Sequence, residues 1–138
     1  MKEYRLKELK KGHLEVFSVT ITNVMMRSFM RISGDVNPMH TDNEFSQKYG
    51  FSGKVVYGML TSAFYSKLVG VYLPGKYALL QGIDITFQKP VYIGDELRVS
   101  GYVHHINEAY KQIEIKAWIT NQEEVQISRA KIKVGVNG

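Results

Sequence analysis

The sequence predicts an α+β fold in which an antiparallel β-sheet wraps around one long central α-helix, in a single domain over residues 1–138. Two observations support this prediction. Apolar residues recur at helical spacing between Tyr57 and Tyr72, and most of the chain after Pro74-Gly75 alternates between apolar and polar residues, as half-buried strands do. The helix is apolar over so much of its circumference that we expect other structure to surround it.

The residues before the central helix predict one strand and two shorter helices. Alternation over residues 13–21 favours a strand. Thr22 is a residue type that caps helix N-termini, and Gly34 is placed to end the helix that follows. Asp42 can cap a second, short helix that ends at Gly50.

Four alternating segments follow the central helix, and we expect consecutive segments to pair as an antiparallel meander with one buried face. These segments cover residues 83–87, 97–103, 113–119 and 127–134. Turns are expected at Lys89-Pro90, Gly94-Asp95, Asn107-Glu108 and Asn121-Gln122. One apolar helix followed by such a sheet is a compact two-layer arrangement.

The composition is that of an ordinary globular protein, with 44% hydrophobic and 22% charged residues among 138. No run approaches the roughly 20 apolar residues that cross a bilayer, so no membrane partner is expected. The chain has no cysteine, which excludes disulfides, thiolate nucleophiles and cysteine metal ligands. Its first residues lack the apolar core of a signal peptide, and a cytoplasmic location is therefore expected.

The net charge of +5 comes from 18 basic and 13 acidic residues. The basic residues are scattered from Lys2 to Lys133, and the one dense group, Lys7, Lys10 and Lys11, is short and has no interleaved aromatic residues. A nucleic-acid-binding domain normally concentrates its charge, so no nucleic-acid partner is expected. A phosphate-bearing small ligand or a merely basic surface explains the excess equally well.

One loop carries the pattern that points to chemistry. Asp35 and His40 are five positions apart, in a stretch that Gly34 and Pro38 force to turn. Proline disfavours the helical conformation for the residue before it, Asn37, so the carboxylate and the imidazole flank a compact turn and can converge on one water molecule. Such a pair can act as general acid and base. The alternative is structural: an Asx turn at Asp35 and a partly buried imidazole.

Three blocks of the sequence resemble the MaoC-like (R)-specific enoyl-CoA hydratases, also called type 2 enoyl-CoA hydratases. Gly34-Asp35-Val36-Asn37-Pro38-Met39-His40, followed by Ser46, is similar to the hydratase signature of this family. Val55–Leu60 is similar to its hydrophobic-His-Gly-Met-Leu segment, and Phe87–Asp95 to its Phe-x-Lys-Pro-Val-x-x-Gly-Asp segment. The resemblance covers the chain from about Phe17 to its end and implies a hotdog fold, usually dimerised edge to edge.

The resemblance also implies an activity: a lyase of fatty acid metabolism that reversibly hydrates trans-2-enoyl-CoA to (R)-3-hydroxyacyl-CoA without a cofactor. Asp35 and His40 are then the catalytic pair that holds the water. Asn37 has no proton to give at neutral pH, and we expect its amide to support the loop. No metal site is expected, since His40 is the only histidine near the methionine-rich stretch and cysteine is absent.

Three further residues are candidates for substrate contact. The backbone N–H of Gly58 stands at the positive end of the central helix and suits an oxyanion hole, although a glycine that merely begins a helix is the structural alternative. By resemblance, Ser66 falls where the family has a serine lining the site. The structural alternative is a small residue that permits close packing of the helix on the sheet. Tyr57 replaces the usual histidine and is expected to narrow the route of the acyl chain past Ser66 toward Met25, Met26 and Phe29, which favours short chains.

Two other functions remain open on the sequence alone. A thioesterase of this fold would place a carboxylate on the central helix, but residues 57–72 contain no Asp or Glu. A non-catalytic acyl-thioester-binding protein would not need an intact Asp35 and His40. The expected partners are the enoyl-CoA substrate, with Lys89 as a candidate contact for CoA phosphates, and a second copy of the chain, because a sheet of this length leaves an edge strand exposed.

Overall fold

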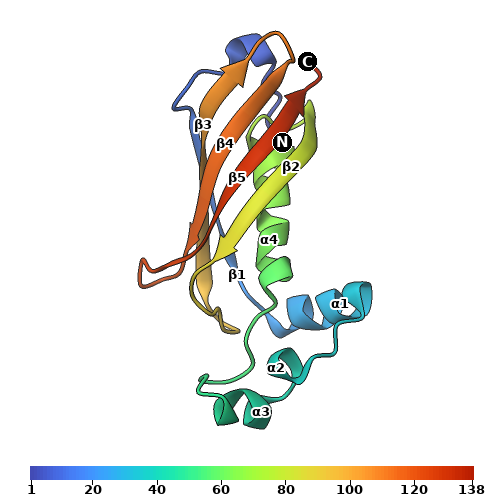
Figure 1. The fold of residues 1–138 in the computed structure, drawn as a ribbon, viewed down its shortest axis with the longest axis vertical. Helices are drawn as coiled ribbons and strands as arrows, with labels where there is room; N and C mark the ends of the chain where they lie inside the picture. Colours follow the sequence, from blue (N-terminus) through green and yellow to red (C-terminus); the bar gives the residue numbers. More distant parts are fainter.

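The computed structural model describes residues 1–138 as a five-stranded antiparallel sheet that curves around a central helix (Figure 1). The strands are β1 (Leu14–Thr20), β2 (Ala78–Phe87), β3 (Glu96–Asn107), β4 (Gln112–Thr120) and β5 (Gln126–Val136). They are ordered β1-β3-β4-β5-β2 across the sheet. The architecture confirms the predicted α+β class.

The predicted meander is correct for β3, β4 and β5 but wrong for β2. Strand β2 pairs with β5 at one edge, and β1 occupies the place beside β3. The residues between β2 and β3 do not form a hairpin turn because their backbone bonds elsewhere. The Val91 carbonyl accepts from the N–H of Val56, and the N–H of Gly94 donates to Ile21. Residues 88–95 therefore carry the chain across the end of the sheet.

Three short helices gather at one end of the sheet, away from both chain termini (Figure 1). Helix α1 (Asn23–Ser33) begins where the Thr22 side chain accepts from a backbone N–H, and it ends at Gly34, which is left-handed with φ of 73°. Helix α2 covers Pro38–Thr41, and α3 (Asn43–Lys48) is capped by the Asp42 carboxylate. The caps predicted at both ends of α1 and at the start of α3 are confirmed.

The central helix α4 (Gly58–Lys67) continues through the π-helical turn η2 (Leu68–Tyr72), as the apolar spacing predicts. Its buried side chains pack on the inner faces of the strands, and the approach is close at Leu68. A Cβ on Gly101 of β3 would lie 2.6 Å from Leu68 Cδ2, so only glycine fits under the helix at this point. None of the helices has the length and apolar character that crossing a membrane requires.

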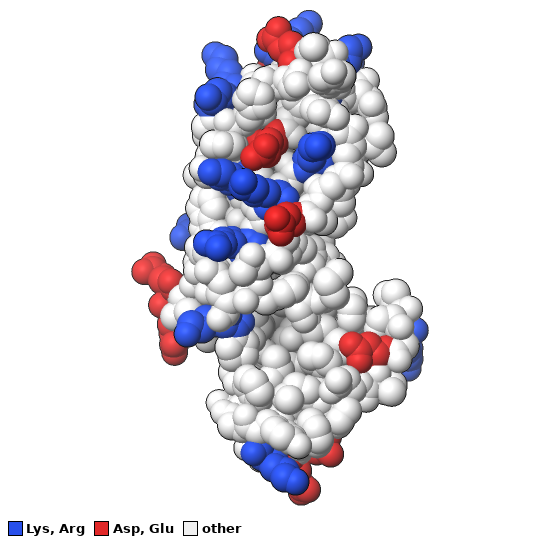
Figure 2. Space-filling model, viewed as in Figure 1, with Lys and Arg blue, Asp and Glu red and all other residues white.

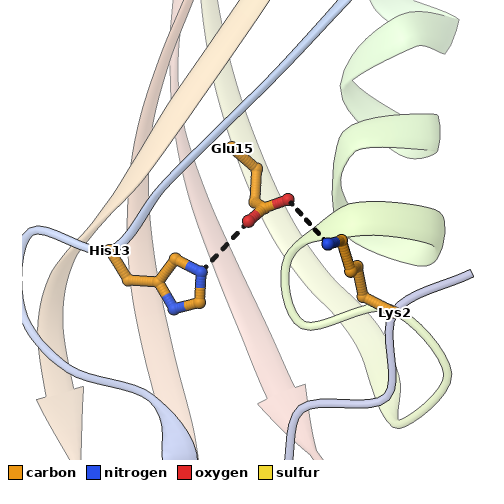
Figure 3. A network of polar contacts seen from close by, with 3 residues as sticks. All are labelled: Lys2, His13 and Glu15. Carbon is orange, nitrogen blue, oxygen red and sulfur yellow. Dashed lines mark hydrogen bonds and ion pairs between the residues drawn. The ribbon is translucent and has the colours of Figure 1, made fainter.

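The N-terminal segment, which includes the short helix η1 (Leu6–Glu8), is tied to β1 through one carboxylate (Figure 3). Glu15 Oε2 lies 3.1 Å from His13 Nε2, and its Oε1 lies 3.9 Å from Lys2 Nζ. The N–H of Lys2 also donates to the carbonyl of Val71 at the end of the central helix. These contacts hold the segment against the end of the fold opposite α1–α3.

Candidate active site

The loop between α1 and α2 is held by the side chains of its own acidic and amide residues. The Asp35 carboxylate accepts from the N–H of Asn37 at 3.0 Å, which forms the Asx turn, and the Asn37 side chain accepts from the N–H of Met39 at 2.9 Å, which caps α2. Asn37 is thus placed where a loop-supporting residue is expected. Asp35 Oδ2 has no partner within the chain and remains available to a ligand.

His40 is oriented by a backbone carbonyl. Its Nδ1 lies 2.6 Å from the carbonyl oxygen of Val55, and this oxygen can only accept, so Nδ1 carries the proton. In the neutral ring Nε2 then holds a lone pair, and no group of the chain bonds to it. A histidine fixed in this tautomer can accept a proton from a water molecule.

Tyr57 joins the loop to the start of α4. Its hydroxyl donates to the carbonyl of Asp35 at 2.6 Å, and its ring lies 4.2 Å from that of His40 and 4.7 Å from that of Phe29, between centroids. The side chain is only 3% exposed. Burial, together with the nearby charge of Asp35, raises the pKa of Tyr57, so its hydroxyl stays protonated as a donor at neutral pH.

Gly58 is the first residue of α4, and its backbone N–H has no acceptor in the chain. Tyr57, the N-cap residue, makes no side-chain capping bond, so the N-terminus of α4 keeps unpaired N–H groups at the positive end of the helix dipole. A Cβ on residue 58 would stand 2.9 Å from Cε1 of the half-exposed Phe87, so a glycine lets the Phe87 ring keep its place against the start of the helix. Gly58 can therefore both begin the helix beside Phe87 and offer its N–H to a ligand.

These groups line one cavity of about 650 Å³. It contains four of the candidate residues, Asp35, His40, Tyr57 and Gly58, and also Lys89. The other lining residues are mostly apolar and come from α1, the segment between α3 and α4, α4, β5 and the segment around the end of β2: Phe29, Ser33, Phe51, Val56, Met59, Thr61, Phe87, Gln88, Pro90, Val91 and Ile127. Polar groups that converge on one wall of an apolar cavity are typical of a small-molecule site.

Ser66 stands apart from this group within the chain. It is exposed on α4 and does not line the cavity. Eight residues correspond to two helical turns plus about 80°, so Gly58 and Ser66 lie roughly 12 Å apart along the axis and on different sides of the helix. Met26 likewise lines a smaller cavity of about 220 Å³ on the other side of His40, while Phe29 lines the main one. A role for Ser66 in substrate binding stays a prediction.

Two contacts at this candidate site could not be predicted from the sequence. The carbonyl of Val55, which fixes the His40 tautomer, gives no signal in the sequence because any residue supplies a carbonyl. Phe87 was recognised only as part of a motif, and its contact with Gly58 depends on how β2 packs beside α4. Both contacts join segments that are far apart along the chain.

Comparison with known proteins finds a matching family model and related sequences. A family model described as "MaoC like domain" matches residues 7–126. An (R)-specific enoyl-CoA hydratase of Aeromonas caviae is 39% identical over 70 residues, which cover 51% of this chain and 52% of that protein. A mitochondrial 3-hydroxyacyl-(acyl-carrier-protein) dehydratase of Arabidopsis thaliana is 36% identical over 72 residues, covering 52% and 42%. The aligned stretch therefore spans about half the length of these relatives or less.

The fold is also that of a solved hydratase. The structure of an (R)-hydratase from A. caviae involved in PHA biosynthesis superposes with a TM-score of 0.90 at 27% identity, and the match covers 94% of this chain and 98% of that chain. The likeness confirms the hotdog fold that the three sequence blocks imply.

The bond from Tyr57 to Asp35 predicts a measurable effect of its removal. Tyr57→Phe keeps the ring and deletes the hydroxyl, so the Asp35 carbonyl loses its donor. We expect the free energy of unfolding to fall by about 1 kcal/mol, measured by urea denaturation. We also expect faster amide hydrogen exchange at Asn37 and Met39, because the loop loses its tie to α4.

Tyr49→Phe is the matched control, since the Tyr49 hydroxyl is exposed and has no partner. It should change stability by less than about 0.5 kcal/mol and leave exchange in the loop unaltered. Equal effects of the two substitutions would show that the bond to Asp35 does not hold the loop.

Proposed function

The chain belongs to the family of MaoC-like domains, and on this premise we propose that it reversibly hydrates trans-2-enoyl-CoA to (R)-3-hydroxyacyl-CoA at the cavity beside α4. The observation that carries the proposal is the convergence of three groups on this cavity. They are His40 Nε2, the unpartnered oxygen of Asp35 and the free N–H of Gly58. The handedness of the product rests on the relatives alone, since some of them are named (R)-specific hydratases.

In the proposed reaction one water molecule is held between Asp35 and His40. The pair accepts a proton from the water as its oxygen bonds to C3 of the enoyl group, and it delivers a proton to C2. Two coupled groups share this proton, so the transfer is assigned to the pair and not to one residue. Negative charge develops on the thioester oxygen during the addition, and the N–H of Gly58 at the positive end of α4 is proposed to stabilise it.

The catalytic pair is tested by its removal. Asp35→Asn and His40→Ala should each lower the rate of crotonyl-CoA hydration by at least about 100-fold, because a positioned acid or base contributes roughly 10²–10⁴-fold. Loss of the enoyl-thioester absorbance measures the rate, and circular dichroism checks the fold.

His105→Ala is the matched control, because His105 is exposed on β3 and distant in sequence from the loop. It should keep full activity. Near-normal turnover in either site variant would place the chemistry elsewhere. Release of free CoA by the wild type, with no hydration, would point instead to a thioesterase.

We propose a preference for short enoyl chains, of about four to six carbons. The ring of Tyr57 lines the cavity and is packed between His40 and Phe29, so it cannot swing aside to admit a longer chain. A methylene that finds apolar room gains about 0.8 kcal/mol, and one that does not fit strains the site.

Lys89 lines the same cavity and is the proposed contact for a CoA phosphate.

This preference is measured by kcat/KM for crotonyl-CoA and dodecenoyl-CoA. The wild type should favour crotonyl-CoA, and Tyr57→His should shift the ratio toward the longer substrate. Tyr57→Phe, which keeps the bulk of the ring, should leave the ratio unchanged and separates the steric effect from the lost hydrogen bond. A wild type that favours the twelve-carbon substrate would contradict the proposal.

We also propose that the protein acts as a homodimer joined at β2. This strand is the edge of the sheet beside β5, and a long exposed edge favours pairing with another copy. Leu80, Ile83 and Phe87 are in register with buried or helix-facing residues of β5, yet they are 44%, 41% and 50% exposed. A second copy would cover them, and Phe87 would bring the interface next to the cavity.

Sedimentation equilibrium tests the dimer. The wild type should show twice the mass of one chain at micromolar concentration, and Ile83→Lys should shift it toward the monomer. Val24→Lys, which places the same charge at an exposed apolar position of α1, should remain dimeric. A single-chain mass for the wild type would rule the interface out.

A further inference from the structure

The outer face of the sheet, opposite α4, gathers cationic and aromatic side chains from three strands. Tyr102 of β3 is in register with Lys116 of β4 and through it with Lys131 of β5, and Trp118 is in register with Arg129. Residues in register point to the same side of a sheet. We call these five residues the basic–aromatic face. Figure 2 shows basic side chains grouped over the sheet, with acidic side chains among them.

The positive charges of this face have no partners. Lys116 and Lys131 stand directly opposite each other, an arrangement that destabilises a sheet. Asp84 is in register with Lys131, and Glu114 with Lys133, but neither carboxylate forms an ion pair, and the ion pairs of the chain all lie near its N-terminal segment. An anion that binds here would relieve the repulsion.

The basic–aromatic face is hollowed. All five of its residues line a cavity of about 560 Å³, which Asp84 also lines. The ring centroids of Tyr102 and Trp118 are 6.1 Å apart at 65°, an edge-to-face contact that holds the indole in place. The volume is that of a small-molecule site, and the aromatic residues offer a surface on which a flat ring can stack.

Basic side chains continue beyond the cavity in a row along β5. Arg129, Lys131 and Lys133 occupy alternate positions of β5, so they share a face at intervals of about 6.8 Å. All three are exposed. A single phosphate would use one or two of them, whereas a chain of phosphates would use the whole row.

We propose that the basic–aromatic face binds single-stranded nucleic acid without sequence preference. A base stacks on Trp118, and successive phosphates lie against Lys116, Lys131 and Arg129. The scattered basic residues of the sequence predict no such partner, but the fold brings those of β4 and β5 onto one surface. A positively charged track with an aromatic platform is the arrangement that binds single strands. This binding is independent of the cavity beside α4.

Trp118 is the only tryptophan of the chain and reports stacking directly. Titration with an oligouridylate of about eight nucleotides in low salt should quench its fluorescence, with a dissociation constant of roughly 10⁻⁶–10⁻⁴ M. Inorganic polyphosphate of equal charge carries no bases and should not quench. The proposal would be overturned if no oligonucleotide bound at about 100 µM. It would also be overturned if polyphosphate bound with equal affinity and neither ligand quenched the fluorescence of Trp118.

Variants separate the charges from the ring. Lys116→Gln/Lys131→Gln should weaken binding of a labelled oligonucleotide at least tenfold and lower the slope of log K against log salt by about 1.4. Lys7→Gln/Lys11→Gln removes the same charge from the N-terminal region and should weaken binding less than threefold. Trp118→Ala should weaken binding about tenfold, whereas Trp118→Phe should retain most of it.

Hydration of crotonyl-CoA, measured on the same variants, should stay at the wild-type rate, which separates this proposal from that of the active site. Equal weakening by the two double variants would reduce the effect to net charge and overturn the proposed site. Full binding by Trp118→Ala would overturn the stacking.

Discussion

The candidate site depends on four consecutive residues, Val55–Gly58, that fix the loop of Asp35 and His40 to the start of α4. The carbonyl of Val55 accepts from His40, the hydroxyl of Tyr57 donates to Asp35, and the N–H of Gly58 stays unpaired. The segment is itself held by the bond from Val56 to Val91. Because α4 packs against the inner face of the sheet (Figure 1), the positions of the acid–base pair and of the free N–H are set by the same rigid element.

Local chemistry could be predicted from the sequence because its causes are local. Thr22, Gly34 and Asp42 act at the helix ends as their side chains and backbone preferences dictate, and the Asx turn at Asp35 follows from its spacing to Asn37. The strands and the central helix could also be predicted, because the period of the apolar residues is a local property of the sequence. The position of β2 at the sheet edge could not be predicted, because alternation shows that a segment is a strand and not which strand it pairs with.

Charge illustrates the same limit. Lys116 and Lys131 are far apart in the sequence, and no short window along the chain joins Lys116 to the basic residues around Lys131. The register of β4 and β5 places them opposite each other, and the alternation that buries Ile115 and Ile132 necessarily turns the lysines outward. A scattered charge pattern in a β-protein therefore says little about its surface until the strand order and register are known. The inner face of the sheet is occupied by α4, which leaves the outer face free for a separate function.

Gly58 shows why a site residue can be hard to prove by substitution. Every residue except proline supplies a backbone N–H, so Gly58→Ala would keep the proposed oxyanion donor. The new Cβ would nevertheless lie 2.9 Å from Cε1 of the half-exposed Phe87, so the Phe87 ring or the start of α4 would have to move. A moved ring would change the wall of the cavity, and a moved helix start would disturb the bond from Tyr57 to Asp35, so lost activity would not by itself identify the N–H of Gly58 as the donor. A smaller residue at Phe87 removes the clash, and only in that background does an alanine at position 58 test the space that a substrate needs beside the N–H.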